Sequence, residues 1–196
     1  MGRFLLGIVI GVLLVPALVL AWFRYGHPPV AVGDQPLAAE KMITSLPLEA
    51  RIDREAPQSP PFQPDEASYV AGARLYGDRC AVCHGFHGKP SEIASHMFPS
   101  APQLWEKHAN SNVIGVSDDP PGETYWKIAD GIRLTGMPAF KELLSETQMW
   151  QIGLLLANAD KPLPPEVLEI VRDEQPAAAG AGTQNTQAAP APAKKQ

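Results

Sequence analysis

The sequence contains only two cysteines, Cys80 and Cys83, which stand three positions apart. A disulfide framework needs several cysteine pairs, so the chain is not one of the small cross-linked secreted domains. Basic clusters are also missing: the formal net charge is −5, and residues 65–160 hold 7 Lys/Arg against 12 Asp/Glu. Nucleic acids are bound through clustered Lys and Arg, so this balance excludes a nucleic-acid partner. It favours protein partners with basic docking patches.

Apolar residues are scarce at the carboxyl end of the chain, and proline is abundant in its first third. Residues 176–196 are mainly Ala, Pro, Gly and Gln, and residues 26–64 contain eight prolines. The first composition predicts a disordered tail, and the second a Pro-rich tether with a short helix near residues 37–43. Such a tether spans roughly 35 Å as a coil and roughly 120 Å when fully extended. Between tether and tail we expect a folded domain over residues 65–160, followed by an extension over residues 161–175.

Charge is absent from one long stretch near the amino terminus. Residues 4–23 are uncharged and rich in Leu, Val and Ile. As a helix they span roughly 30 Å, the thickness of a hydrocarbon core. The aromatic residues around Arg24 resemble the belt found at membrane interfaces. A cleaved signal peptide is the alternative, but the stretch exceeds the roughly 7–15 apolar residues of such a signal, which favours a transmembrane anchor over residues 1–25.

The two cysteines are followed directly by a histidine, in the order Cys80-Ala81-Val82-Cys83-His84. This C-x-x-C-H pattern indicates covalent attachment of a c-type haem. The two thiols add to the vinyl groups on one edge of the porphyrin and form thioethers. His84 then lies under the iron as an axial ligand.

Two other interpretations of the cysteine pair stay open at this point. A redox-active C-x-x-C needs a βαβ context, and no strand pattern flanks the motif. A zinc site needs further ligands at spacings that this sequence does not match to a common zinc pattern. The nearby histidines that such a site would use are His87, His96 and His108.

A second candidate ligand is Met137, which comes 53 residues after His84 in the run Gly136-Met137-Pro138-Ala139-Phe140. A lone methionine usually fills a core. This one stands in a Gly/Pro turn instead of on a helix face. Its thioether is a soft ligand that, paired with histidine, favours the reduced iron. The rival ligands are Met97, which also lies in a loop, and His96 or His108, which would give bis-histidine ligation.

Three helices are predicted inside the domain. Asp65 can cap a helix that runs to about residue 79. Ser145 and Gln148 form a capping-box pattern that opens a helix to about residue 158. A third, shorter helix is expected over residues 123–131, and no strand is predicted.

With these elements, residues 65–160 resemble a class I cytochrome c domain, in which attachment motif, methionine turn and C-terminal helix follow in the same order. The family fold is all-α, with an N-terminal and a C-terminal helix that cross beside one covalent haem. Gly72 resembles the glycine that lets these helices touch, with Tyr76 as its aromatic neighbour. Pro102 resembles the proline whose carbonyl accepts the Nδ1 hydrogen of His84.

The resemblance also implies a function. One covalent haem c ligated by His84 and Met137 has no open iron position, which implies an electron carrier with no small-molecule substrate, and not an enzyme. Trp126 and Arg133 are candidates for hydrogen bonds to the haem propionates. Haem attachment occurs outside the cytoplasm, so the domain is expected on the periplasmic side of the inner membrane, as a mobile shuttle or as a subunit of a respiratory redox complex. The alternatives are a haem enzyme or gas sensor with a displaceable distal ligand, and a zinc-stabilised adaptor.

Overall fold

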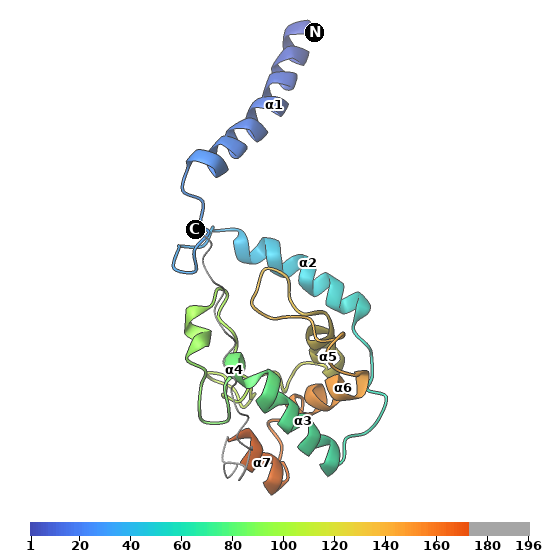
Figure 1. Ribbon diagram of the computed structural model, residues 1–196. Coiled ribbons are helices and arrows are strands. Elements are labelled where there is room, and N and C mark those ends of the chain that lie inside the picture. Colours follow the sequence, from blue (N-terminus) through green and yellow to red (C-terminus); the bar gives the residue numbers. More distant parts are fainter. Residues whose placement is uncertain (173–196) are drawn as a thin grey trace, which may run out of the picture.

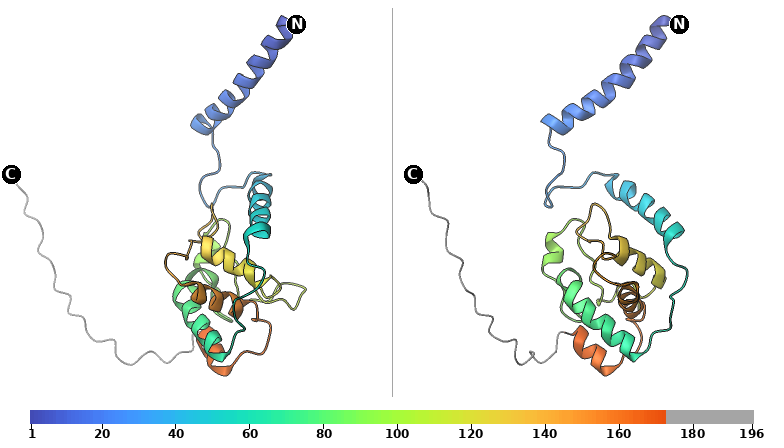
Figure 2. Two further views of the ribbon diagram at one scale, coloured as in Figure 1. Left: turned by 90° about the vertical axis from the view of Figure 1, so that its right-hand side faces the viewer. Right: turned by 45° about the vertical axis from the view of Figure 1, so that its right-hand side comes forward.

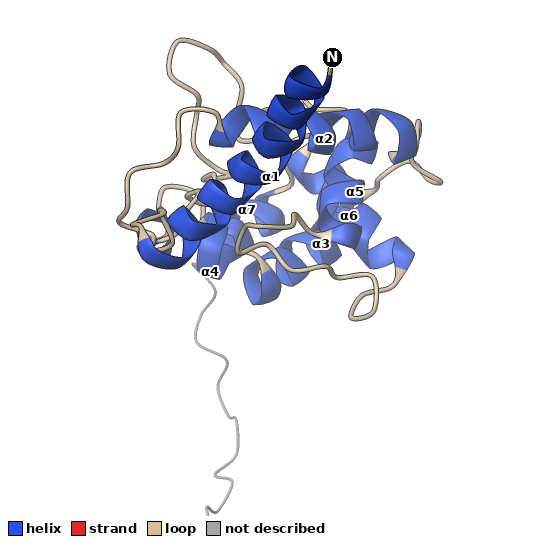
Figure 3. Cartoon of the chain, turned by 90° about the horizontal axis from the view of Figure 1, so that it is seen from above, coloured by secondary structure: helices blue, strands red, loops and turns tan. Residues whose placement is uncertain are grey.

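The computed structural model of the protein describes residues 1–172, so the predicted disordered tail at 176–196 lies outside the described residues. In the described part the regular elements are helices, with isolated β-bridges and no strand (Figure 3). The all-α prediction is therefore confirmed. The elements are α1 (Gly2–Tyr25), α2 (Glu40–Glu55), α3 (Glu66–Arg79), α4 (Ala81–His84), the 3-10 helix η1 (Ile93–His96), α5 (Pro121–Asp130), α6 (Glu146–Leu156) and α7 (Pro165–Val171) (Figure 1).

Helices α3 and α6 form the centre of the domain. Asp65 caps α3 by accepting a hydrogen bond from Ser68 N at 2.8 Å, and Ser145 and Gln148 form the predicted capping box of α6. The two helices touch at Gly72, which is buried. A Cβ at this position would overlap the carbonyl oxygen of Gln151, so only glycine lets the two backbones come this close.

Helix α5 packs against α6 on the side away from α3. The contact is aromatic: Tyr125 of α5 stacks on Trp150 of α6 with ring centroids 4.4 Å apart. Gly153 follows one turn after Trp150 and lies 3.6 Å from the backbone of Tyr125, measured from a Cβ built on the glycine. Helix α5 thereby leads the chain into the loop that carries Met137.

Helix α7 falls in the segment that was expected to be an extension outside the domain. In the structure it packs against α3, and the side chains of Val167 and Val171 are fully buried. The carbonyl of Val171 accepts a hydrogen bond from His87 N at 2.8 Å. Residues 165–171 are thus part of the domain core.

Helix α2 falls in the segment that was expected to be a tether. It covers residues 40–55, more than twice the length of the expected short helix at residues 37–43, and it packs against α5. Its one buried side chain is Ile52. The chain after α2 stays close to the domain, because the carbonyl oxygen of Pro57 lies against Gly122, where a Cβ would not fit. Before α2, residues 26–39 form no helix or strand and are mostly exposed.

Helix α1 stands apart from the domain in the views of Figure 1 and Figure 2. It has no buried residue, and it is long and apolar enough to cross a membrane. Pro16 lies inside the helix, and a basic residue, Arg24, occupies its last turn.

Candidate haem-binding site

The attachment motif is a direct continuation of α3. Cys80 ends α3 and also precedes α4, the single turn that runs from Ala81 to His84. The amide of His84 donates to the carbonyl of Cys80 at 2.9 Å, which closes this helical turn. In a helical turn, residues three and four apart share a face. The two cysteines and the histidine therefore face the same side.

The turn ends at Gly85, which has a positive φ of 72°. A side chain there would be strained, and its Cβ would overlap the Gln103 side chain. The carbonyl of Gly85 accepts a hydrogen bond at 2.7 Å from the hydroxyl of Tyr76, a fully buried residue of α3. Tyr76 thus fixes the end of the motif to the helix that precedes it.

His84 makes a hydrogen bond through Nδ1 to the carbonyl oxygen of Pro102, at 2.8 Å. A carbonyl can only accept, so Nδ1 carries the proton and Nε2 keeps the lone pair that binds a metal. Burial lowers the pKa of His84, and the hydrogen bond to Pro102 partly opposes this effect. The neutral imidazole is therefore favoured, which is the form that ligates iron.

The loop that supplies Pro102 is held by Gln103, a residue that the sequence analysis did not single out. Its Oε1 accepts from Ser91 N at 2.7 Å, and its Nε2 donates to the carbonyls of Cys83 at 3.3 Å and Ala101 at 3.1 Å. Ser91 also donates its hydroxyl to the carbonyl of Val82 at 2.6 Å. Gln103 thereby joins the attachment turn to the segments on both sides of it. The sequence feature that could have indicated Gln103 is its position directly after the expected proline, Pro102.

The cysteine environment argues against the redox and zinc interpretations. Burial, and secondarily the charge of Cys83, raises the pKa of Cys80 to about 12. A redox-active cysteine depends on a thiolate, which needs a lowered pKa. In addition, no three His, Cys, Asp or Glu side chains within residues 1–172 come together as a metal site.

Met137 lies in a turn between α5 and α6, and its side chain is half-buried against the core. Its amide donates to Thr135 Oγ1 at 3.1 Å, and its carbonyl accepts from Ile132 N at 3.3 Å. Thr135 Oγ1 donates in turn to the carbonyl of Ile132 at 2.6 Å. The turn starts at Gly131, whose φ is 65° and whose missing Cβ leaves room for the backbone of residues 137–139. The sequence context of this methionine is thus a tight turn, as predicted; its ligation of iron stays a prediction.

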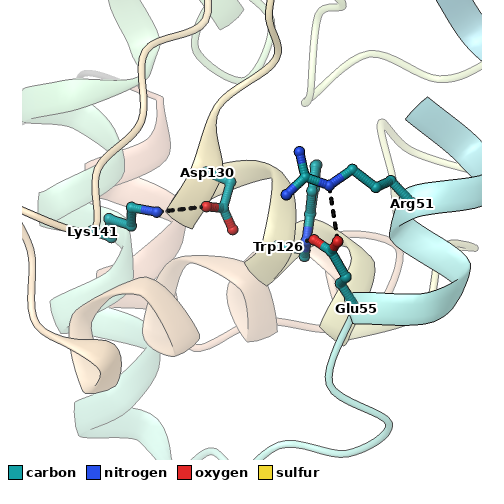
Figure 4. Close-up of polar contacts among 5 residues, drawn as sticks. All are labelled: Arg51, Glu55, Trp126, Asp130 and Lys141. Atoms are coloured by element: carbon teal, nitrogen blue, oxygen red, sulfur yellow. Dashed lines mark hydrogen bonds and ion pairs between the residues drawn. The ribbon is translucent and has the colours of Figure 1, made fainter. Parts of the chain in front are cut away.

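The two residues expected near the propionates lie in different settings. Trp126 is buried in α5, and its Nε1 donates to Glu55 Oε2 of α2 at 3.2 Å (Figure 4). The guanidinium of Arg51 lies 5.8 Å from the centre of the same ring. Arg133 is exposed in the Met137 turn. The one N–H group of the Trp126 indole is thus used in a hydrogen bond to α2, which the sequence did not suggest. Hydrogen bonds from Trp126 and Arg133 to the haem propionates stay predictions.

The structure places the other candidate ligands, and the nearby His87, in different environments. His96 on η1 and His108 in the following loop are exposed. His87 is half-buried beside Trp105, with ring centroids 6.3 Å apart. Met97 is half-buried, and its methyl group lies against Gly136, directly before Met137.

Comparison with known proteins concerns the same part of the chain. The family model of cytochrome c oxidase, cbb3-type, subunit III, matches residues 67–154, which include the attachment motif and the methionine turn. A search of curated proteins gave no match. Among solved structures, the chain is similar to one from the Kuenenia stuttgartiensis reducing HAO-like protein complex Kustc0457/Kustc0458, with 20% identity and a TM-score of 0.39. That match covers 71% of this chain and 54% of the other, so the chain spans about half the length of that relative. Residues 67–154, just under half of the chain, therefore form a cytochrome c domain, and haem c is the cofactor that such a domain implies.

Proposed function

We propose that the protein is a membrane-tethered carrier of single electrons with one haem c. Cys80 and Cys83 would hold the haem as thioethers, and His84 and Met137 would be the axial ligands of its iron. The hydrogen bond between His84 Nδ1 and Pro102 O carries this proposal, because it leaves Nε2 as the nitrogen that can ligate a metal. Bound haem c supplies a centre that gains and loses one electron reversibly.

The roles of the protein residues follow from their chemistry. Pro102 orients the imidazole of His84 and raises its basicity, which favours the oxidised iron. The thioether of Met137 is a soft donor and favours the reduced iron. The balance of these two effects would set the reduction potential of the iron. Since both axial positions would be taken by protein atoms, small molecules would have no open position to bind.

The length of the tether bears on how the electrons travel. Because α2 is packed on the domain, the free chain after α1 is the fourteen residues 26–39. Such a segment spans roughly 20 Å as a coil and roughly 45 Å when extended, against roughly 35 and 120 Å for the whole of residues 26–64. This short reach favours a subunit, or a carrier that serves partners beside it, over a long-range shuttle.

The remaining parts of the proposal concern place and partners. Helix α1 is the single anchor in the inner membrane, with the domain on the periplasmic side, where haem is attached in this family. The acidic balance of residues 65–160 favours redox partners that present basic patches.

The first test is a visible spectrum of the holoprotein, oxidised and reduced, with and without carbon monoxide. We expect a low-spin c-type spectrum with the ferric methionine–iron charge-transfer band and no effect of carbon monoxide. Met137→Ala should lose that band and bind carbon monoxide, while Met42→Ala, on the exposed side of α2, should change neither. A wild-type protein that binds carbon monoxide would instead be a sensor or an enzyme. A protein without covalent haem would contradict the proposal as a whole.

A further inference from the structure

We propose that Met97 is a positioning residue for the distal ligand: it holds the Met137 turn closed against the His84 side of the site. The inference rests on the proposed ligation by Met137 and adds to it a residue 40 positions away in the sequence. It starts from the contact between the methyl group of Met97 and Gly136.

Met97 belongs to the His84 side of the site. Its segment begins at Ser91, which is joined to the attachment turn through Val82 O at 2.6 Å and to Gln103 at 2.7 Å. The 3-10 helix η1 follows and packs against α4, and its Ala94 is buried. The amide of Met97 donates to the carbonyl of Ala94 at 3.3 Å. The position of Met97 is therefore fixed relative to the turn that carries the cysteines and His84.

Gly136 belongs to the other side, since it directly precedes Met137. A Cβ at Gly136 would overlap the Met97 methyl carbon, and the Met97 sulfur would lie 4.0 Å from it. The φ of Gly136 is not in the left-handed region, so the backbone conformation does not require glycine here. Glycine is instead required by the space that Met97 occupies. The thioether side chain thus reaches from the proximal segment to the backbone of the distal one.

The Met137 side chain packs partly against the core, and after the turn the amides of Phe140 and Lys141 donate to carbonyls of α5. Within the described chain, the hydrogen bonds of residues 132–137 stay inside the turn, at Ile132, Thr135 and Met137. Leu134 at its tip is 76% exposed. A segment with local hydrogen bonds and few buried contacts opens more easily than the core around it. The side-chain contact from Met97 is a long-range contact at the residue before the ligand.

The consequence can be measured through competition at the iron. An added ligand binds only when the turn is open, so its apparent affinity is scaled by the open fraction. Truncating a half-buried methionine removes packing on the closed state alone. We expect Met97→Ala to raise the affinity for imidazole by about tenfold, in line with the effect of losing part of a buried side chain.

The experiment is an imidazole titration of the ferric holoprotein, followed by loss of the methionine–iron band. Met97→Leu, which keeps the bulk of the side chain but not the sulfur, should restore an affinity close to that of the wild type. Gly136→Ala should raise the affinity because its methyl group displaces Met97. The double variant should then raise the imidazole affinity no further than the more effective of the two single changes, because both changes break the same contact. Denaturant unfolding of each variant separates turn opening from global stability, and Met42→Ala is the matched control.

Several results would overturn the inference. An unchanged imidazole affinity in Met97→Ala would do so, as would strictly additive effects of Met97→Ala and Gly136→Ala. An affinity change that only follows global unfolding would make Met97 an ordinary packing residue. Loss of the band in Met97→Ala without any imidazole would mean that Met97 is itself the ligand. A wild-type protein that lacks the band would contradict the proposed Met137 ligation, which is a separate outcome.

Discussion

The carboxylate of Glu55 accepts a hydrogen bond from the indole of Trp126, 71 residues later in the chain, at 3.2 Å. Arg51, one turn earlier on α2, donates to the same carboxylate at 2.9 Å and lies over the Trp126 ring (Figure 4). On the other side of Trp126, α5 ends with Asp130, which pairs with Lys141 at 2.8 Å. Helix α2 is therefore joined to α5 by the contacts of Glu55 and Arg51 with Trp126, and its Ile52 side chain is buried.

Ile52→Ala should release α2 from the domain. Truncating a buried isoleucine costs about 2–4 kcal/mol, and here the loss falls on a helix held by few other buried groups. We expect hydrogen-exchange protection of residues 40–55 to drop sharply, while α3 and α6 keep theirs. Ile43→Ala on the same helix is the control, because Ile43 is 65% exposed and its truncation should cost less than about 0.5 kcal/mol. Unchanged protection of α2 in Ile52→Ala would show that the polar contacts alone hold it.

The elements that the sequence predicted best carry their own local signals. The caps of α3 and α6 depend on residues three positions apart, and a glycine within a helix predicts a close contact. Pro102 was named through the family resemblance, and its carbonyl does meet His84 Nδ1.

The elements that the sequence did not predict depend on tertiary contacts. Helix α2 has one buried residue and carries Pro47 inside it, so its periodicity is weak. Helix α7 has seven residues, too few for a clear period, and is stable because Val167 and Val171 are buried against α3. Gln103 acts through side-chain hydrogen bonds to the backbone, which leave no periodic pattern in a sequence.

Gly72→Ala should destabilise the domain because the new Cβ would collide with backbone atoms of Gln151, which cannot move aside as a flexible side chain can. Forcing an extra methyl group into such a contact costs about 1–3 kcal/mol or more. Gly77→Ala, also on α3, is the matched control. Its Cβ would lie 3.6 Å from the Phe86 ring, an ordinary contact, and alanine in a helix stabilises by about 0.5–1 kcal/mol over glycine. Thermal unfolding of the two holoproteins should therefore shift in opposite directions, and equal shifts would contradict the close contact of α3 with α6.

Asp65→Asn should lower stability at neutral pH but not in strong acid. Hydrogen bonds from the hydroxyl and then the amide of Ser68 lower the pKa of Asp65 below its ordinary value of 3.8. The stability that depends on the charged carboxylate is present above pH 3.8 and is lost as the pH falls through the lower pKa of the folded state. Asparagine still caps the helix, so the difference between wild type and variant isolates the charge.

The difference between the unfolding temperatures of the two proteins should therefore shrink as the pH is lowered below 3.8. Ser68→Ala, which removes the hydroxyl donor, should shift this loss to higher pH. A difference that stays constant with pH would mean that the Asp65 carboxylate titrates alike in both states.

Gln103→Ala should raise the midpoint potential and also destabilise the domain. The change removes three hydrogen bonds, to Ser91, Cys83 and Ala101, and leaves half-buried backbone groups unpaired, at a cost of about 1–3 kcal/mol. Because the Pro102 carbonyl loses its support, its bond to His84 weakens and the imidazole becomes a poorer donor to ferric iron. A redox titration measures the potential, and denaturant unfolding measures the stability. Gln58→Ala, on the exposed loop before α3, should change neither. If stability falls while the potential stays at the wild-type value, Gln103 supports the fold of the loop without tuning His84.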